Sequence, residues 1–470
     1  MRVRSPERIT VTVPETMLAE ASTVKLRCEL SRTLSRTAKS FVSLLPKGES
    51  QNLCKKSPER SRRGRLRTTD MEIRKITLDE KVEFRTLLKY CFTSGSNDDA
   101  ITASDVSWIT LDEAFAVFID GTIVSALRNI NFKQSIRGVL KDMGGIASVA
   151  TAPEYRRQGH IKALMKAAFG DMKHKGQVVS ALHPFKESFY AAYGYVTTNA
   201  WIDVKIPSHS IAHYLDGVRP LDSHWQFERV KAIDVKAEVL SFVTQLSTMP
   251  HGLVIDPERP DEVWQNHHRN SRVIFVKKTG KTQAIAKYTK KGQLETGEIV
   301  IREMYWQNLE ARDKLFGFFA LHQDNCPYIW MRVPFGTNFR SWLRDAMTPF
   351  ETKIYYRPMM VRVIDVEKAV ESLPAVVDGE ISFALQDNYC NWNTGDYQLI
   401  AQSGQLKAVR AKDSSRKIIM KIEGLSALVY GALSIPEIVH RGWLTGLDEK
   451  TTELLEHWFP TTLVYNPYYF

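Results

Sequence analysis

A basic, glycine-containing segment, Arg156-Arg157-Gln158-Gly159-His160-Ile161, follows the apolar run Val149-Ala150-Thr151 and leads into an amphipathic pattern. A strand that enters a helix through such a turn aims several backbone N–H groups, and the positive end of the helix dipole, at one point. Gly159 lets the backbone approach a ligand closely because it has no Cβ. The segment therefore predicts a pyrophosphate site, although an ordinary helix start with solvated arginines would show the same residues.

The elements around this turn follow an α/β pattern. A hairpin is predicted around Asp120-Gly121, because this dipeptide favours a two-residue turn between strands. A helix is predicted after the turn, because apolar residues recur there at helical spacing from Ile161 to Met172, with Gly176 as its C-terminal cap. The remaining elements expected in this unit are strands 114–119, 122–130, 145–151 and 178–182, a short helix 186–193 and a closing strand region 195–206.

Two further units follow in the sequence. Residues 272–333 repeat the order hairpin, strand, helix, strand without a glycine-containing turn, which predicts a degenerate second copy of the first unit. A third unit is expected to begin with a strand at Met360–Asp365. It continues with strands near 381–385, 397–401 and 406–411 and with helices at 424–433 and 435–441.

About thirty residues after the basic turn, the segment Phe189-Tyr190-Ala-Ala-Tyr193-Gly194-Tyr195 appears at the spacing found in GNAT acetyltransferases. Residues 71–470 as a whole resemble the Eis-type (enhanced intracellular survival) branch of that superfamily. The resemblance also rests on Met359-Met-Val-Arg-Val-Ile-Asp365 and on the aromatic end at Phe470. It implies a mixed α/β (α+β) fold of tandem GNAT-like folds followed by a sterol-carrier-protein-like domain, with units at 71–207, 208–358 and 359–470.

The resemblance also implies a cofactor and catalytic roles. Acetyl-CoA would lie with its pantetheine arm along the strand end and its pyrophosphate on the turn, and no metal is expected. Tyr190 would be the general acid, because a phenol with a pKa near 10 can protonate a leaving thiolate. Tyr193 and Tyr195 are expected to be packing residues. The cofactor-binding residues would be Val149, Ala150, Thr151, Arg156, Arg157, Gln158, Gly159, His160 and Ile161, where Ile161 stands at a position that usually holds Gly or Ala.

The general base is less evident from the sequence. Many members of the superfamily carry a Glu on the strand before the turn, but Met143-Gly-Gly-Ile-Ala-Ser-Val149 offers no acid. In the Eis-type branch the carboxylate of the last residue takes this role, which here would be Phe470. Asp142, Glu187 and His183 are the nearby alternatives.

The charge of the chain is unevenly distributed. The total is +11, but residues 1–70 hold 16 of the 64 Lys/Arg and 7 of the 53 Asp/Glu, so residues 71–470 carry only +2. We call residues 1–70 the leader, and we predict that it is disordered or is an extension of the gene before a true start at Met71. The alternative is an arm that binds nucleic acid. Five scattered cysteines fit a reducing, cytoplasmic setting, and no apolar run is long enough to span a membrane.

These observations predict an N-acetyltransferase that moves an acetyl group from acetyl-CoA to an amine of a small cationic acceptor. Aminoglycosides, polyamines and lysine-like amines are the acceptors in view. The alternative is a non-catalytic carrier of a lipid or another apolar ligand through its C-terminal unit. Family likeness further implies a homo-oligomer, a hexamer. The lack of a long apolar run and the nearly neutral charge of residues 71–470 argue against a membrane or nucleic-acid partner.

Overall fold

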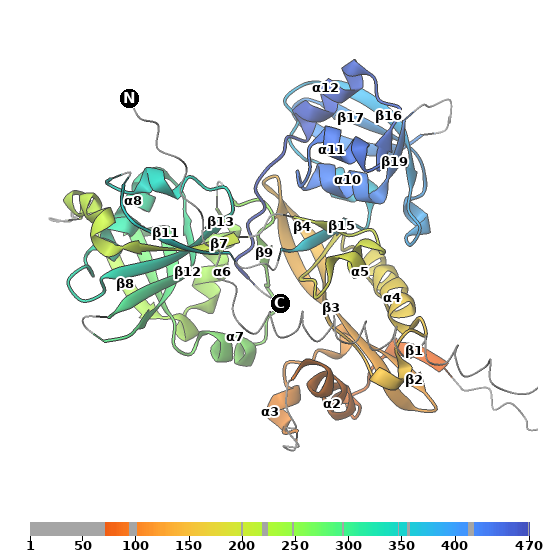
Figure 1. The fold of residues 1–470 in the computed structure, drawn as a ribbon, viewed down its shortest axis with the longest axis horizontal. Coiled ribbons are helices and arrows are strands. Elements are labelled where there is room, and N and C mark those ends of the chain that lie inside the picture. The colour runs from red at the N-terminus through yellow and green to blue at the C-terminus, as the bar shows by residue number, and fades with distance from the viewer. Residues whose placement is uncertain are drawn as a thin grey trace, which may run out of the picture. The chain divides into compact units, whose positions relative to one another are not determined.

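The structure is a computed structural model that describes residues 71–93, 101–198, 201–218, 224–246, 249–293, 296–345, 347–354, 358–411, 418–468 and 470. The predicted basic leader, residues 1–70, lies outside the described residues. The chain from Thr68 onward forms one compact unit, and its described part builds three β-sheets with helices packed on them (Figure 1).

The first sheet has the strand order β1-β2-β3-β4-β5-β15-β6, with β9 paired to β3, and only β4 and β5 run parallel. The predicted hairpin turn is present, since Asp120 and Gly121 both have positive φ (48° and 81°), as a primed two-residue turn requires. The strands are β1 (Met71–Lys75), β2 (Ala114–Ile119), β3 (Thr122–Ile136), β4 (Val139–Thr151), β5 (Val179–Leu182), β6 (Val196–Thr197), β9 (Val254–Ile255) and β15 (Met360–Val363).

The helices of this first region include the predicted amphipathic one. It buries Leu164, Ala168 and Met172 on one face, and Gly176 ends it in the left-handed conformation (φ 73°). The helices are α2 (Lys81–Phe92), α3 (Ala103–Val106), α4 (His160–Lys175) and α5 (Glu187–Ala191).

The second sheet has the order β14-β7-β13-β12-β11-β10-β8, and here only β12 and β13 run parallel. The predicted repeat of hairpin, strand, helix and strand is present as β10–β11, β12, α8 and β13. The strands are β7 (Trp201–Pro207), β8 (Trp225–Lys231), β10 (Arg272–Lys278), β11 (Lys281–Lys291), β12 (Glu298–Trp306), β13 (Tyr328–Pro334) and β14 (Glu351–Ile354); the helices are α6 (Lys236–Thr244), α7 (Asp261–His268) and α8 (Leu309–Ala320).

The third sheet has the order β18-β17-β16-β19-β20 and carries four helices (Figure 1). Its strands are β16 (Gly379–Gln386), β17 (Gly395–Gln402), β18 (Gln405–Arg410), β19 (Ile419–Lys421) and β20 (Leu444–Thr445). Its helices are α9 (Val366–Val370), α10 (Ile422–Val429), α11 (Ile435–His440) and α12 (Glu449–Trp458).

Two strands lie in a different sheet from the one that the sequence suggests. The predicted closing strand 195–206 divides into β6, which stays in the first sheet, and β7, which joins the second. The strand expected to open the third unit, β15, instead inserts between β5 and β6 of the first sheet. All four residues of β15 are buried, so this strand needs neighbours on both edges and cover on both faces. The predicted unit limits at 207 and 358 therefore do not coincide with sheet membership.

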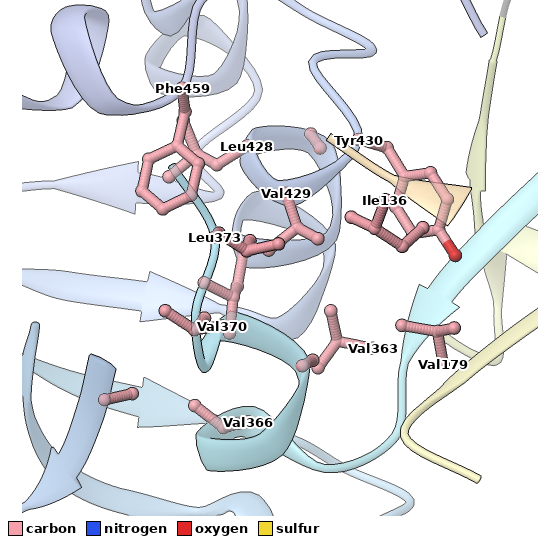
Figure 2. Close-up of a cluster of buried hydrophobic side chains, with 14 of the residues drawn as sticks. Ile136, Val179, Val363, Val366, Val370, Leu373, Leu428, Val429, Tyr430 and Phe459 are labelled. Atoms are coloured by element: carbon pink, nitrogen blue, oxygen red, sulfur yellow. The ribbon is translucent and has the colours of Figure 1, made fainter. Parts of the chain in front are cut away.

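A continuous apolar core joins the first sheet to the C-terminal unit. Figure 2 shows Ile136 from β3 beside Tyr430, and Val179 from β5 beside Val363. The same cluster extends through α9 and α10 to Trp458 at the end of α12. Because these side chains exclude water together, the C-terminal unit supports the first sheet directly.

Candidate active site

The parallel strands β4 and β5 form a notch where they stop pairing. They pair over four residue pairs, from Met143–Val179 to Ile146–Leu182, and β4 then continues to Thr151. A bulge in this last part of β4 gives Ser148 a φ of 55°. Among the described strands none pairs with the open edge of residues 147–151, so an extended amide chain such as a pantetheine arm can add there as a strand would.

The basic turn follows this notch and begins α4. Arg157 and Gly159 have positive φ (64° and 87°), and nothing lies within 4 Å of the position that a Cβ on Gly159 would take. The N-terminus of α4 has no side-chain cap, and its first helical bond is from Ala163 N–H to Gly159 O. The N–H groups at the start of the helix therefore remain available for a phosphate.

One buried histidine at this turn also lacks a partner. His160 is 5% exposed, and its Nε2 makes no hydrogen bond within the described part of the chain. Arg156, Arg157 and Gln158 are exposed beside it, and Arg156 Nε donates to Thr151 O at 3.2 Å. An open strand edge, an uncapped helix start and an unsatisfied buried donor or acceptor together fit the pantetheine and pyrophosphate of acetyl-CoA.

A cavity of about 1010 Å³ begins at the notch. Its lining includes Ile146–Val149 of β4, Tyr190 of α5 and the last residue, Phe470. The structure thus brings the predicted acid and the predicted base to the same cavity, although 280 residues separate them in the sequence.

Tyr190 is held in a cluster of aromatic rings. Its side chain is 4% exposed, and its ring centroid lies 5.7 Å from Phe185 and 5.1 Å from Phe189. The α5 helix ends in a tight turn in which Tyr193 N–H donates to Tyr190 O at 2.9 Å and Gly194 has a φ of 83°. The neighbouring Tyr195 is buried, and its hydroxyl bonds Ser180 Oγ at 2.7 Å. Burial raises the pKa of Tyr195, which fits a packing residue.

Phe470 packs against the sheet at the other side of the notch. Its ring lies 4.8 Å from Phe132 and 5.1 Å from His183, and it would contact a Cβ on Gly145 at 3.1 Å. These contacts fix the Phe470 ring, and the last residue of the chain thereby lines the cavity.

The alternative bases have different surroundings. Asp142 is ion-paired with Lys133 at 2.6 Å, and Glu187 accepts a hydrogen bond from Thr197 at 2.7 Å; neither lines the cavity. His183 does line the cavity, and its Nε2 lies 3.4 Å from Tyr468 O.

Three acids line the far side of the cavity, and the sequence analysis did not identify them. Glu113 is ion-paired with Arg128 at 2.6 Å, and Asp256 with Arg259 at 2.8 Å. Glu258 accepts a 3.4 Å hydrogen bond from Asn131 Nδ2. Glu113 comes from the segment before β2, and Asp256 and Glu258 come from the loop after β9, so no local spacing could have indicated them.

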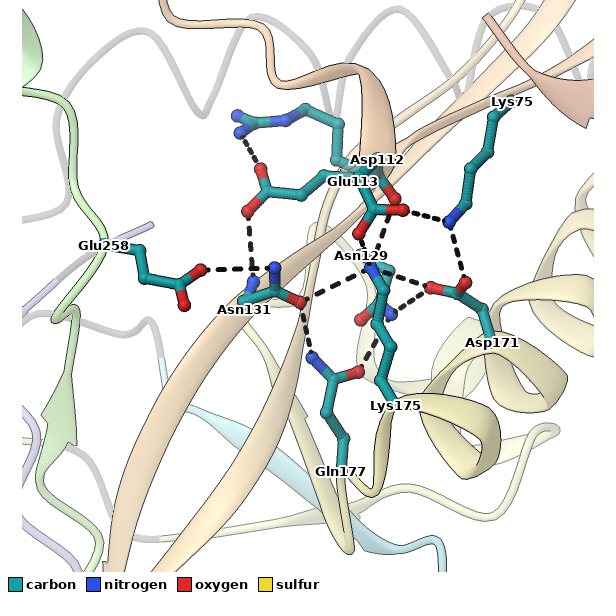
Figure 3. A network of polar contacts seen from close by, with 10 residues as sticks. Lys75, Asp112, Glu113, Asn129, Asn131, Asp171, Lys175, Gln177 and Glu258 are labelled. Carbon is teal, nitrogen blue, oxygen red and sulfur yellow. Dashed lines mark hydrogen bonds and ion pairs between the residues drawn. The ribbon is translucent and has the colours of Figure 1, made fainter.

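A polar network fixes this side of the cavity. Figure 3 shows Asn131 between Glu113 and Glu258 and next to Gln177. Gln177 accepts from Asn129, whose side chain is fully buried and also donates to Asp171 of α4 at 2.9 Å. The acids of the cavity are thereby connected to α4, the helix that follows the basic turn. The Asn129 Oδ1 atom has no hydrogen-bond partner within the described part of the chain, so the network is only partly satisfied.

The described residues contain no group of three or more His, Cys, Asp or Glu side chains that could hold a metal ion. No helix in the described ranges is both long and apolar enough to cross a bilayer.

Comparisons with known proteins match two parts of the chain to domain families. Residues 72–198 match the acetyltransferase (GNAT) domain family, and residues 366–467 match the sterol carrier protein domain family. An uncharacterized N-acetyltransferase of Streptomyces avermitilis is 22% identical over 391 residues, which cover 75% of this chain and 90% of that protein.

Solved structures share the whole arrangement of folds. A GCN5-related N-acetyltransferase from Anabaena variabilis superimposes with a TM-score of 0.71 at 19% identity, over 85% of this chain and 100% of that chain. Eis1 from Mycobacterium abscessus does so with a TM-score of 0.67 at 15% identity, over 85% of this chain and 100% of that chain. The predicted fold class, tandem GNAT-like folds followed by a sterol-carrier-protein-like domain, is confirmed.

Proposed function

From the premise that this chain is an acetyl-CoA-dependent GNAT acetyltransferase with the Eis-type arrangement of domains, we propose that it acetylates an amine of a small cationic acceptor. The observation that carries the proposal is the shared cavity, which the open end of β4, Tyr190 and Phe470 all line. The thioester therefore reaches the cavity from the notch, and the acceptor occupies the side lined by the three acids.

The reaction needs one proton donor and one proton acceptor. The amine nitrogen forms a bond to the thioester carbonyl carbon, the C–S bond breaks, and the leaving thiolate must gain a proton. The Tyr190 hydroxyl is the donor at that sulfur in our proposal, since Tyr190 lines the same cavity as the strand end that would hold the thioester. A positioned acid of this kind contributes about 10²–10⁴-fold to the rate.

The terminal carboxylate of Phe470 is the proposed acceptor of the amine proton. An α-carboxylate has an ordinary pKa of about 3.3–3.7, so it is ionised at neutral pH without activation. It is a weak base toward an alkylammonium, so it acts through a water or by favouring the free amine.

The charge of the cavity supports a cationic acceptor. The two arginines of the lining are each paired with one acid, Arg128 with Glu113 and Arg259 with Asp256. Glu258 and the terminal carboxylate remain as negative charges outside these ion pairs. In a cavity partly shielded from water they attract positive charge and disfavour anions. A diamine or polyamine matches these two negative charges, because it can place one amine at each carboxylate.

The test is an acceptor screen with acetyl-CoA, in which released thiol is measured. Diamines and polyamines should react with a kcat/KM at least roughly tenfold above a monoamine of equal length, as one extra charge-assisted bond of about 1.5–3 kcal/mol would give. Glu258→Gln should raise KM for the acceptor and leave the affinity for acetyl-CoA unchanged. Absence of thiol release with every amine, in a protein that carries lipid through purification, would instead support the apolar-ligand alternative.

A further inference from the structure

The second sheet contains its own version of the notch. β12 and β13 pair in parallel over Glu298–Ile301 and Tyr328–Met331, four residue pairs, as β4 and β5 do. Both strands then continue to Trp306 and Pro334 without pairing with each other, while β12 stays paired with β11 and β13 with β7. A cavity of about 270 Å³ lies there and is lined by Met304, Tyr305 and Trp306 of β12 and by Arg332, Val333 and Pro334 of β13.

This second notch is not suited to a pyrophosphate. Only Gln307 and Asn308 separate β12 from α8, whereas residues 152–159 separate β4 from α4. Asn308 also caps α8, because its side chain accepts a 2.9 Å hydrogen bond from Ala311 N–H. The N–H group that a phosphate would use is therefore already bonded.

The chain's own C-terminal segment enters the second notch instead. Tyr465 lines the cavity with its neighbour Leu463, and its side chain is 6% exposed. Its N–H donates to His251 O at 2.8 Å, and its hydroxyl donates to Arg332 O at 3.3 Å. Val464 packs over Gly252, where any Cβ would collide with it.

Arg332 fixes the next part of this segment. Its Nε and Nη2 donate to the Asp203 carboxylate of β7 at 2.8 and 3.2 Å, and its Nη1 donates to Pro467 O at 3.3 Å. One guanidinium thus connects two strands of the second sheet to the backbone three residues before Phe470.

Asn466 then bends the segment toward the catalytic cavity. It is 2% exposed, its Oδ1 accepts from the N–H groups of Val254 (3.3 Å) and Tyr468 (3.4 Å), and its Nδ2 donates to Tyr468 O at 2.7 Å. Arg259 lies over the Tyr468 ring at 4.0 Å. Five residues therefore carry the chain from Tyr465 in the second notch to Phe470 in the catalytic cavity.

We propose that the second notch is a socket for the C-terminal segment, and that Asn466 and Arg332 are positioning residues that set where the Phe470 carboxylate lies. This proposal rests on the proposed function, in which that carboxylate accepts a proton. The second GNAT-like fold thereby contributes to catalysis without binding a cofactor. A terminal residue held by this socket gains the fixed geometry that a flexible chain end would lack.

The test compares four full-length proteins: the parent, Asn466→Leu, the parent extended by Gly-Ser after Phe470, and the extended protein that also carries Asn466→Leu. Asn466→Leu keeps the volume but removes the hydrogen bonds to Val254 and Tyr468 and the weaker one to Met359 Sδ, so kcat should fall by roughly 10²-fold, as misplacement by about 1 Å can cause. The extension should lower kcat by about 10²–10⁴-fold. The protein with both changes should be no slower than the extended protein. The extension has already moved the carboxylate away, so the loss of Asn466, which acts only by positioning that carboxylate, has no further effect on kcat.

Controls separate positioning from folding. Thr461→Leu changes an exposed residue of the same segment and should leave kcat unchanged. Tyr465→Phe should lose less activity than Tyr465→Ala, because only the alanine empties the socket. Acetyl-CoA affinity should remain close to that of the parent in the tail variants. The thermal midpoint of each variant is measured as well, and kcat is compared far below it, because Tyr465→Ala and Asn466→Leu also remove buried contacts.

The outcomes are distinguishable. If Asn466→Leu and Tyr465→Ala keep the parent kcat while the extension abolishes turnover, the terminal base stands and the socket proposal is wrong. If the effects of Asn466→Leu and the extension multiply, Asn466 does not act through the carboxylate. If the extended protein turns over normally, the terminal base itself is wrong, and the search returns to His183.

Discussion

Arg362 on β15 makes a buried ion pair whose loss can be predicted in detail. Arg362 and Asp387 are both fully buried, and Arg362 Nη2 donates to both carboxylate oxygens at 2.6 and 2.7 Å. Its Nη1 donates to Tyr193 O in the turn after Tyr190, and a Cβ on Gly194 would collide with it. The C-terminal unit therefore holds the turn that carries the proposed acid.

The variant Arg362→Met keeps most of the side-chain volume and removes the charge. Breaking a buried pair by removing one partner costs about 3–5 kcal/mol, because the other charge stays buried. Asp387 keeps hydrogen bonds from the N–H groups of Tyr389 and Cys390 (3.0 Å each) and from Asn393 (3.0 Å), so we expect a loss near 3 kcal/mol. kcat should fall more than acetyl-CoA affinity, since the Tyr193 carbonyl is released.

The assay is urea denaturation followed by tryptophan fluorescence, with turnover measured on the same samples. Combining Arg362→Met with Asp387→Asn should recover at least about 1 kcal/mol relative to the sum of the two single losses. Arg441→Met is the matched control, because Arg441 and Glu437 form an exposed pair at 2.7 Å that should be worth at most about 1 kcal/mol. Additive losses, or a single loss equal to that of the control, would refute the reasoning.

Three more outcomes are expected. Tyr190→Phe should lower kcat by about 10²–10⁴-fold without loss of folding, as measured by thiol release and circular dichroism; normal turnover would place the acid elsewhere. Arg157→Gly, which suits the positive φ at this position, should weaken acetyl-CoA binding roughly fivefold at low salt and less at high salt, as calorimetry can show. Burial lowers the pKa of His251 to about 4, below its ordinary 6.5, so the unfolded chain binds more protons between these pH values and stability falls as the pH drops from 6.5 toward 4. His251→Asn should remove up to about 3 kcal/mol of that pH dependence in denaturation curves, and an unchanged slope would contradict it.

The parts of the fold that the sequence predicted are those with a local cause. The apolar spacing from Ile161 to Met172 is a property of one helix, and the Asp120-Gly121 turn depends on the backbone preferences of two residues. The basic turn at Gly159 likewise has its conformation and charge within a few residues.

The remaining features depend on contacts between distant segments. The apolar pattern of Met360–Val363 predicts a buried strand, but nothing in these four residues indicates that its neighbours are β5 and β6. Glu113 and Glu258 are separated by 145 residues and approach each other only because both contact Asn131. Asn466 has no distinguishing neighbours in the sequence, and its importance appears only when Val254 N–H is found within reach.

The insertion of β15 has a consequence for the order in which the protein is made. β6 ends at Thr197, and β15, which must lie between β5 and β6, begins at Met360. A nascent chain that has already produced the basic turn and β6 therefore has a first sheet that still lacks β15. The apolar residues of β5, which β15 later covers, stay exposed at an unpaired edge while the second sheet is still being synthesised. We expect chaperone dependence during translation, and a fragment that ends after β6 should aggregate rather than behave as a minimal enzyme.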